Sequence, residues 1–469
     1  MKKVIMKFGG TSVATGEKIK NLARLVADYA RQDYTIAIVV SALDGITEQL
    51  IEATEKAEKG KADFIHLFKQ QILERHFKAA KVAIENKKIL KEIQDVIQAI
   101  VDELEKVLIG ICYLKELTPK SSDYVLSFGE RLAAPIVYGA LRDVRLKTQY
   151  FSGKEAGIVT DSNFGEASPL MDVTTHQLKE RIEPLLEDRI IPVVTGFIAA
   201  TQEGVITTLG RGGSDQTGTI LGAALAADEI WIWTDVDGLM TADPRIVPSA
   251  KLLHELSYQE AAEMAIFGAK AMHPKALEPA VKSEIPVRIR NVTNPGSPGT
   301  LIWKNHVADK AQVVKAVALI GDVAMINVTG SGMVGVPGSY AKILEVLGKN
   351  SINVMMISTA VSEANISFII RRNLLERALS TLEIALLGKN AFTQVSYEDD
   401  VCVIATMGAQ MKGTKGVASR IFTAVAKRGI NVRMIAQGSS ELNISFVVKE
   451  EDGEETVRAI HEEFELYEN

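Results

Sequence analysis

The 469-residue sequence has few cysteines and no long apolar run. Its two cysteines, Cys112 and Cys402, lie far apart and form neither a CxxC pair nor a disulfide framework, which favours a reducing compartment. Only three apolar residues separate Lys3 from Lys7, too few for a signal peptide. No apolar run approaches the roughly 20 residues that span a bilayer. We therefore expect a cytoplasmic protein with no membrane partner.

The chain also lacks an excess of one charge sign. Its 53 basic and 59 acidic residues give a formal net charge of −6. That balance differs from the strong basic excess typical of proteins that bind nucleic acid, so no nucleic-acid partner is expected. Apolar residues make up 47% of the sequence, enough for several ordinary cores. At roughly 150 residues per domain, the length predicts about three domains.

Strand-like runs alternate with helical patterns over the first part of the chain. The predicted strands are Val4–Phe8, Thr35–Val40, Ile190–Thr195, Val205–Thr208, Glu229–Thr234 and Pro286–Ile289. The predicted helices are Glu17–Arg31, Ala62–Glu85, Lys88–Lys115, Ser122–Arg142, Ser214–Leu225 and Ser257–Phe267. Runs as apolar as Thr35–Val40 are typical of parallel strands covered on both faces. The pattern predicts an α/β fold with a sheet between helices, and the turn-rich Asn294–Gly299 indicates a domain boundary nearby.

Beyond that boundary the sequence repeats itself. Gly330–Phe368 aligns without a gap on Gly408–Phe446. Each copy reads as strand, turn, helix, strand, strand, helix. The second copy ends before a fourth strand, and Val313–Leu319 is an unused strand-like segment. We therefore expect this segment to complete the second copy's sheet. The expected domains are 1–305, 321–398 and 399–469, with 312–320 supplying the missing strand.

The familiar phosphate-binding motifs are absent or unconvincing. No GxxxxGK[ST] occurs, which excludes a P-loop. Gly330, Gly332 and Gly335 form a GxGxxG pattern after a strand, but the second copy has Gln410 at the middle glycine, and no acidic residue ends the next strand. This pattern therefore indicates a turn within a repeated module rather than a dinucleotide site.

Two other glycine clusters join a strand to a helix. In Lys7–Ser12, paired glycines follow a lysine, so backbone N–H groups can approach phosphate oxygens; a plain strand-to-helix turn remains the alternative. In Leu209–Asp215, Arg211 lies between glycines and has the planar fork that binds a carboxylate in two places. Ser214 and Asp215 are also good helix N-caps, and we favour the functional interpretation.

Three further features leave alternatives open. The acidic cluster Thr234–Gly238, followed by Thr241–Arg245, comes after a buried strand, but Asp-Gly and Asp-Pro are common in turns. Glu130 in an apolar helix is either a site or an exposed charge. His273 is more typical of a loop histidine with its hydrogen bonds satisfied than of a base. None of the seven histidines pairs with cysteine or aspartate in zinc or nucleophile spacing, so no protein-only metal site is expected.

In their order along the chain, these motifs resemble the aspartate kinase family. The matching segments are Lys7–Val13, Val40–Ala42, Ser127–Arg131, Thr208–Asp215, Trp233–Gly238, Ala242–Arg245 and Phe267–Pro274. The resemblance covers essentially the whole chain, and the repeated modules resemble ACT domains. It implies an amino-acid-kinase sandwich with a mostly parallel central sheet, followed by two ferredoxin-like βαββαβ ACT domains.

The resemblance implies transfer of the ATP γ-phosphoryl group to the β-carboxylate of L-aspartate, for lysine, threonine and methionine synthesis, with Mg²⁺ bound through the phosphates. It implies catalytic roles for Lys7, Asp215 and Lys270. The implied ATP-binding residues are Lys7, Phe8, Gly9, Gly10, Thr234, Asp235, Met240, Thr241, Ala242, Asp243, Pro244, Arg245 and Lys270. The implied aspartate-binding residues are Ser41, Thr47, Glu130, Arg211, Gly212, Gly213 and Ser214.

The ACT-like modules imply feedback inhibition and a homodimer, or a dimer of dimers, that pairs through them. The effector residues expected from the resemblance are Met333, Gly338, Asn353, Val354, Thr359 and Gln437. The first copy has Thr359 where the second has Gln437, so the effector stays open between lysine and threonine. Two alternatives are a sister kinase acting on glutamate or another small acid, and a catalytically silent amino-acid sensor.

Overall fold

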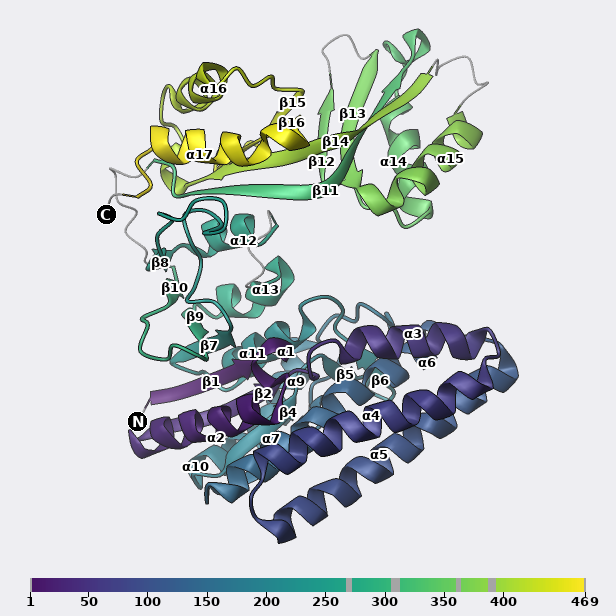
Figure 1. Cartoon of the computed structure of the whole chain (residues 1–469), viewed down its shortest axis with the longest axis vertical. Coiled ribbons are helices and arrows are strands. Elements are labelled where there is room, and N and C mark those ends of the chain that lie inside the picture. Colours follow the sequence, from purple (N-terminus) through teal and green to yellow (C-terminus); the bar gives the residue numbers. More distant parts are fainter. Residues whose placement is uncertain (1, 267–271, 305–312, 360–363, 387–393, 468–469) are drawn as a thin grey trace. The chain divides into compact units, whose positions relative to one another are not determined.

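The computed structural model of the chain describes residues 2–266, 272–304, 313–359, 364–386 and 394–467 (Figure 1). The chain forms two compact units. The first comprises Met1–Leu239, His254–Tyr258 and Lys270–His306. The second comprises Met240–Leu253, Gln259–Ala269 and Val307–Asn469.

The first unit contains an eight-stranded sheet with the order β3-β4-β2-β1-β7-β9-β10-β8. Its strands are β1 (Lys2–Phe8), β2 (Tyr34–Val40), β3 (Thr148–Phe151), β4 (Ile191–Thr195), β7 (Glu229–Thr234), β8 (Glu255–Leu256), β9 (Val287–Asn291) and β10 (Thr300–Ile302). The pairs from β3 to β9 are all parallel, and only the β9–β10 pair is antiparallel. The expected mostly parallel sheet is confirmed.

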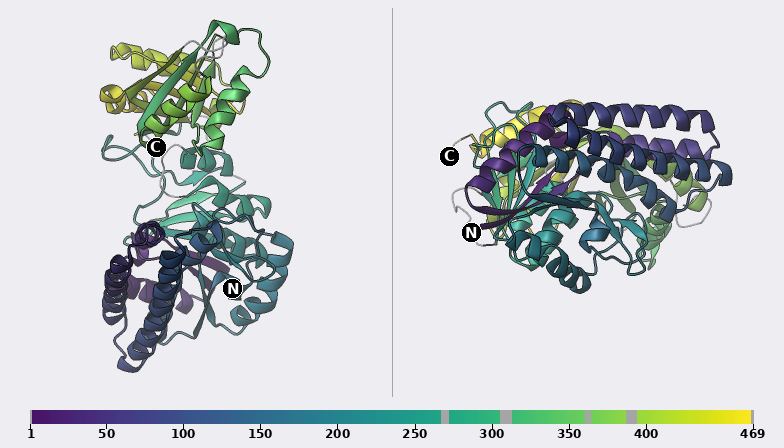
Figure 2. Two further views of the ribbon diagram at one scale, coloured as in Figure 1. Left: turned by 90° about the vertical axis from the view of Figure 1, so that its right-hand side faces the viewer. Right: turned by 90° about the horizontal axis from the view of Figure 1, so that it is seen from below.

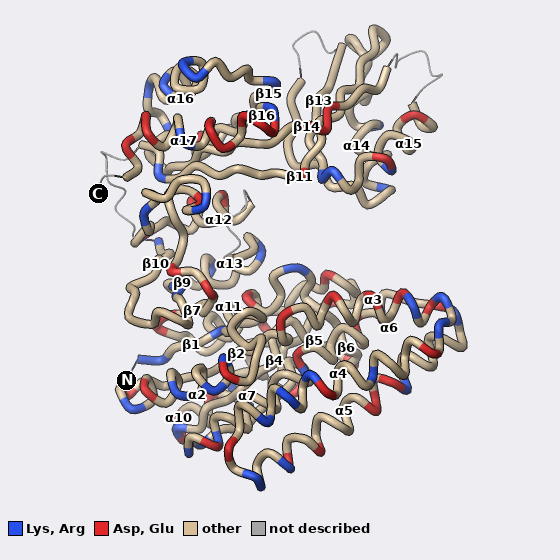
Figure 3. The backbone as a smooth tube through the Cα atoms, viewed as in Figure 1, with Lys and Arg blue, Asp and Glu red and all other residues tan. Residues whose placement is uncertain are grey.

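Helices cover both faces of this sheet. The helices of the unit are α1 (Gly10–Val13), α2 (Gly16–Arg31), α3 (Ile46–Glu58), α4 (Ala62–Ala83), α5 (Lys87–Leu114), α6 (Pro119–Leu126), α7 (Phe128–Asp143), α8 (Gly153–Ala156), α9 (Met171–Arg181), α10 (Glu183–Glu187), α11 (Gly213–Ala224) and α13 (Pro274–Lys282). Val4, Met6 and Phe8 of β1 pack into the core beneath α2 and α7. Helices α4 and α5 lie side by side over this layer (Figure 2), and both charge signs are scattered along them (Figure 3).

Two local predictions differ from the structure. The single helix expected over Ser122–Arg142 is two helices, α6 and α7, and the Ser127 hydroxyl between them donates to the Tyr124 carbonyl at 2.6 Å, a bond that competes with a regular helix. The strand expected over 205–208 is β6 (Ile206–Thr208), which pairs with β5 (Ile198–Ala200) in a separate hairpin. The turn-rich stretch Asn294–Gly299 joins the antiparallel strands β9 and β10, and the last segment of the first unit ends nearby, at His306.

The second unit contains an antiparallel six-stranded sheet with the order β12-β13-β11-β14-β16-β15. Its strands are β11 (Ala316–Thr329), β12 (Met356–Thr359), β13 (Asn365–Arg371), β14 (Gln394–Met407), β15 (Met434–Gln437) and β16 (Asn443–Lys449). Its helices are α12 (Tyr258–Ile266), α14 (Ser339–Lys349), α15 (Leu375–Leu386), α16 (Val417–Lys427) and α17 (Gly453–Glu463).

The two sequence repeats share long strands instead of having four separate strands each. Segments 313–319 and 323–328, expected as two strands, form most of β11, which continues past a register shift between Ile320 and Val323. Asp322, with φ of 54°, lies at that shift. Ala316 at the start of β11 pairs with Met407, so residues 316–320 lie beside the second repeat. No helix in the described part of the chain has the length and apolar character needed to cross a membrane.

Candidate active site

Four parallel strands of the first unit end in one row. Phe8 of β1 pairs with Val40 of β2 and Trp233 of β7, and Val40 pairs with Thr195 of β4. Ligands of open α/β sheets bind outside the carboxyl ends of such strands. The predicted site residues that follow these strand ends directly or end one of them are Gly9, Gly10, Ser41, Thr234 and Asp235. The sheet register therefore places the glycines that follow β1 beside Thr234 and Asp235 at the end of β7.

Lys7 lies on the sheet face that α11 covers. A Cβ on Gly218 of α11 would lie 3.3 Å from Lys7 Cβ, which shows how closely the helix approaches the strand. The Lys7 side chain is buried, and its ammonium forms an ion pair with Asp215 in the first turn of α11. Two of the three predicted catalytic residues are thus in contact. The third, Lys270, lies outside the described residues.

The glycine pair after β1 permits close packing but is not entirely available to a phosphate. A Cβ on Gly10 would lie 3.1 Å from the Ala42 carbonyl oxygen. The Gly9 N–H donates to the Trp233 carbonyl at 3.2 Å, so this N–H group is engaged within the protein. The Phe8 side chain is fully buried and stacks on Trp233 with ring centroids 6.0 Å apart, so only its backbone reaches this edge.

Glu130 is a buried carboxyl in the first turn of α7. Burial has the largest effect and raises the pKa of Glu130 to about 8. Hydrogen bonds from the Ala42 N–H, the Glu130 N–H and the Ser214 hydroxyl lower the pKa, as does the charge of Lys7, but they do not offset burial. Its Oε2 atom is buried and has no hydrogen-bond partner among the described residues. An unpaired buried carboxyl oxygen is costly, and a cation bound beside it would remove that cost. The sequence left Glu130 as either a site residue or an exposed charge, and its burial excludes the exposed charge.

The Arg211 loop joins β6 to α11. Gly212 has φ of 76°, and a Cβ there would lie 2.4 Å from His273 Cβ, so backbone strain and packing both require glycine at this position. Gly213 begins α11, and Ser214 follows in its first turn. Arg211 itself is exposed. His273 accepts a hydrogen bond from the Lys275 N–H at 3.3 Å as the N-cap of α13, in line with the expected loop histidine.

The remaining predicted residues of the first unit lie at the same sheet edge or in its loops. Ser41 is buried, and its N–H donates to the Phe8 carbonyl at 3.2 Å. Thr47 is half-buried in the first turn of α3. Thr234 ends β7, and its hydroxyl donates to the Asp235 carboxylate at 3.2 Å.

Asp123 of α6 is a buried carboxylate that no motif in the sequence indicates. Its oxygens accept from the Thr208 hydroxyl at 2.7 Å, the Thr208 N–H at 2.9 Å and the Gly165 N–H at 3.0 Å. Thr208 leads directly into the Arg211 loop, so Asp123 anchors the start of that loop. Asp123 precedes Glu130 by seven residues, or about two helical turns, a spacing that could have drawn attention to it.

The predicted nucleotide segment Met240–Arg245 belongs to the second unit. Thr241 and Ala242 are buried, and Ala242 joins a hydrophobic core formed mainly by the second repeat. Asp243 and Arg245 form an ion pair at 2.5 Å, and the Arg245 side chain is largely exposed. This segment follows β7 closely in the sequence, but it belongs to the other compact unit.

Five of the predicted effector residues lie in the first repeat, and Gln437 of the second repeat is the counterpart of Thr359. In the first repeat, Met333 is buried, Gly338 is the N-cap of α14 and Thr359 ends β12. Asn353 and Val354 lie between α14 and β12. In the second repeat, Gln437 ends β15 and lines a cavity of about 300 Å³. That cavity is lined by Met411, Thr414, Gly416, Val417, Ala418, Ser419, Gln437, Glu441 and Ile444.

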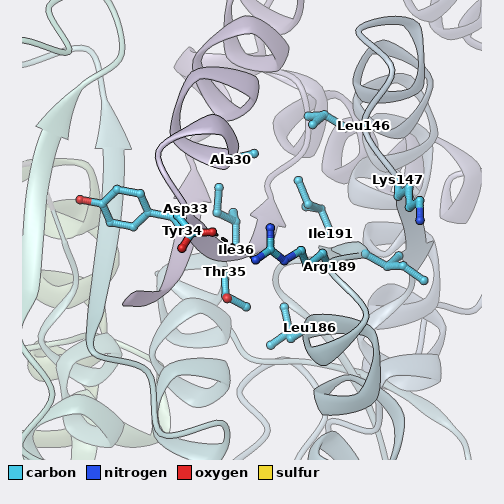
Figure 4. Close-up of a pocket in the computed structure, with 11 residues that line it drawn as sticks. Ala30, Asp33, Tyr34, Thr35, Ile36, Leu146, Lys147, Leu186, Arg189 and Ile191 are labelled. Carbon is cyan, nitrogen blue, oxygen red and sulfur yellow. Dashed lines mark ion pairs between the residues drawn. The ribbon is translucent and has the colours of Figure 1, made fainter. Parts of the chain in front are cut away.

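A smaller cavity of about 70 Å³ lies at the opposite ends of the main-sheet strands (Figure 4). Tyr34 and Ile191, which line it, begin β2 and β4, whereas the predicted site follows the other ends of these strands. Arg189 and Asp33 form an ion pair at 3.3 Å there. No residue of the predicted site lines this cavity.

Comparison with known families accounts for both parts of the chain. The amino acid kinase family profile matches residues 2–291, and an ACT domain profile matches residues 326–386 and 404–464. Fold and site together thus define a class of protein: an amino acid kinase catalytic region followed by tandem ACT domains.

Individual relatives narrow this class. The chain is 34% identical to Aspartokinase 1, chloroplastic, of Arabidopsis thaliana, over 98% of this chain and 80% of the relative. It is also 34% identical to bifunctional aspartokinase/homoserine dehydrogenase 1, chloroplastic, of Zea mays, over 98% of this chain but only 50% of the relative. The chain thus spans about half the length of the bifunctional relative.

Two solved aspartokinase structures resemble the whole chain. The structure of E. coli aspartokinase III with lysine and aspartate (T-state) has a TM-score of 0.81 at 29% identity, covering 100% of both chains. The complex of the same enzyme with aspartate and ADP (R-state) has a TM-score of 0.78, covering 98% of this chain and 99% of that chain. The chain belongs to the aspartokinases of the amino acid kinase family.

The cytoplasmic location expected from the sequence is corrected by the same comparison. The curated relatives named above are chloroplastic enzymes, as are the other aspartokinases of Arabidopsis thaliana that the chain matches at 33% identity. The scarcity of cysteine indicates a reducing environment and does not distinguish one such compartment from another.

Proposed function

We propose that this chain transfers the γ-phosphoryl group of ATP to the β-carboxylate of L-aspartate, under feedback control by an amino acid bound to its ACT domains. The observation that carries the proposal is the convergence of the Lys7–Asp215 ion pair with the buried Glu130 carboxyl at one edge of the parallel sheet. The aspartokinase relatives support the reaction, and the complexes of E. coli aspartokinase III with aspartate, ADP and lysine support the ligands.

In this proposal, different residues bind aspartate and neutralise the charge of the phosphoryl group. Lys7, oriented by Asp215, supplies a positive charge where phosphoryl charge develops. The Glu130 carboxylate accepts hydrogen bonds from the substrate ammonium group, and the exposed guanidinium of Arg211 binds a substrate carboxylate. Phosphoryl transfer needs mainly such positioning and charge neutralisation. The described residues contain no group of three or more His, Cys, Asp or Glu that could hold a metal, so we propose that Mg²⁺ is held largely through the phosphates, whose charge it neutralises.

The deciding experiment is ADP formation from ATP and Mg²⁺ with L-aspartate, L-glutamate or no acid. We expect ADP formation that depends on L-aspartate and exceeds that with L-glutamate. A preference for L-glutamate would indicate the sister kinase, and no ADP formation with any acid would indicate a silent sensor. Adding lysine, threonine or both then identifies the effector. No response to either amino acid would contradict the proposed feedback control.

We also propose that the protein is a homodimer that pairs through its ACT domains. The edge strands β12 and β15 present Ile357 and Ile435, which are 39% and 45% exposed, and exposed edge strands favour pairing with another chain. Light scattering coupled to size-exclusion chromatography tests this, and a monomer at micromolar concentration would contradict it.

A further inference from the structure

Two buried carboxyls on consecutive helices hold the two ends of the Arg211 loop. At the start of the loop, Thr208 donates to Asp123 of α6 through its hydroxyl at 2.7 Å and its N–H at 2.9 Å. At the end of the loop, the Ser214 hydroxyl donates to Glu130 in the first turn of α7. Both carboxyls are buried. The loop is therefore tied at each end to the same pair of helices.

Helices α6 and α7 form a continuous support for these two carboxyls. The Ser127 N–H donates to the Asp123 carbonyl at 3.0 Å, and the Arg131 N–H donates to the Ser127 carbonyl at 3.2 Å. Arg131 also forms an ion pair with Glu103 of α5 at 2.6 Å. Backbone hydrogen bonds thus continue across the junction of the helices, so Asp123 cannot move relative to Glu130 unless that junction changes.

Asp123 also restrains the loop through a neighbouring segment. Its carboxylate accepts a hydrogen bond from the Gly165 N–H at 3.0 Å, and the Ala167 N–H donates to the Thr208 carbonyl at 2.9 Å. A Cβ on Gly210 would lie 3.1 Å from the Gly165 carbonyl oxygen, so this segment packs directly against the loop. Asp123 thus holds both the loop and the segment that supports it.

The exposed Arg211 depends on these anchors for its position. Glycines flank it on both sides, and Gly210 and Gly212 have φ of 75° and 76°. Glycine restricts the backbone less than other residues do, so the placement of the loop comes from its ends and from what packs against it. The loop leads into α11, where Asp215 pairs with Lys7. Its ends therefore also fix where Arg211 lies relative to Lys7.

We propose that Asp123 is a positioning residue that holds Arg211 at a set distance from Glu130 and Lys7, and thereby selects the length of the acid that is phosphorylated. The inference rests on the proposed function, in which Glu130 and Arg211 bind the substrate acid. Aspartate and glutamate differ by one methylene, so a grip suited to one acid places the reacting carboxylate of the other at a different distance from Lys7. One methylene changes specificity by about 10- to 200-fold.

The test compares variants of the full-length protein in the assay of ADP formation with L-aspartate and with L-glutamate. Thr208→Val removes only the hydroxyl that donates to Asp123, and Thr208→Ser keeps that hydroxyl. Asp123→Asn replaces one accepting oxygen with an amide group that donates. Asp95→Asn, at an exposed position on α5, is the control.

We expect Thr208→Val to lower kcat/KM for L-aspartate about five- to tenfold, within the roughly 100-fold that a misplacement of about 1 Å can cost. The ratio of kcat/KM for L-aspartate to that for L-glutamate should fall by about threefold or more, while the KM for ATP changes less than twofold. Asp123→Asn should have larger effects in the same direction. Thr208→Ser and Asp95→Asn should leave all these values within twofold of the unmodified protein.

Thermal unfolding of each variant shows whether its fold is intact, and Asp123→Asn carries the comparison if Thr208→Val does not fold. Equal losses for the two acids, a parallel rise in the KM for ATP, or no recovery with Thr208→Ser would overturn the inference. Turnover with L-glutamate that stays below detection in both the unmodified protein and Asp123→Asn would overturn it as well. An unmodified protein without aspartate-dependent ADP formation would instead refute the proposed function.

Discussion

Binding of L-aspartate should release a proton, because the Glu130 carboxyl is neutral in the unliganded protein. Burial raises the pKa of Glu130 to about 8, so about nine-tenths of the molecules carry this proton at pH 7. In the proposed complex the substrate ammonium meets the unpaired Oε2 atom. A cation within a few ångströms lowers a carboxyl pKa by about 1–3, which drives the proton off.

The size of this release follows from the two pKa values. If the pKa of Glu130 falls by about 1 on binding, half of the complexes stay protonated at pH 7, and if it falls by about 3, almost none do. Aspartate binding at pH 7 should therefore release between about 0.4 and about 0.9 proton per site. Because protons are released, affinity for aspartate should rise as pH rises toward about 8 and level off above it.

Isothermal titration calorimetry measures this number directly. The observed enthalpy of aspartate binding is plotted against the ionisation enthalpy of several buffers at pH 7, and the slope is minus the number of protons released, because each released proton is taken up by the buffer. Glu130→Gln should abolish the slope and weaken binding, whereas Glu187→Gln, at an exposed position on α10, should change neither. A slope near zero in the unmodified protein, or one that persists in Glu130→Gln, would refute the reasoning.

Three further predictions concern single side chains. Lys7→Ala should lower kcat for ADP formation by roughly 10²–10³, the cost of one preorganised donor, and near-normal turnover would remove Lys7 from the mechanism. Arg211→Lys should raise the KM for aspartate far more than that for ATP, because a point charge cannot replace the fork; the opposite pattern would contradict the assignment. Burial lowers the pKa of His76 in α4 to about 4, so its neutral form is favoured in the fold. The neutral His76 ring should therefore contribute fully to stability above about pH 6.5, and the free energy of unfolding should fall by about 3 kcal/mol as the pH drops toward 4. Urea unfolding of His76→Leu should show a smaller pH dependence, and an unchanged one would contradict this.

Much of the site was visible in the sequence, because it sits in strand-to-helix connections. Glycine clusters after Lys7 and around Arg211 predicted the two loops, and the parallel-sheet pattern predicted that strand ends would meet. The Gly9 N–H could not be assigned, because its partner, the Trp233 carbonyl, comes from a distant strand. Asp123 was overlooked for the same reason: its hydrogen bonds go to Thr208 and Gly165, and no local pattern shows them.

The sequence by itself determined the fold class, the repeat and the family, since these depend on periodicity and on motifs that are contiguous along the chain. The tertiary structure alone decided which residues are buried and what they contact. It gave Glu130 a buried environment and a raised pKa, and it placed Met240–Arg245 in the second compact unit. The physical reason is that burial and long-range hydrogen bonds depend on which surfaces pack together, and the scarcity of cysteines and the near balance of charge in the sequence carry no information about that.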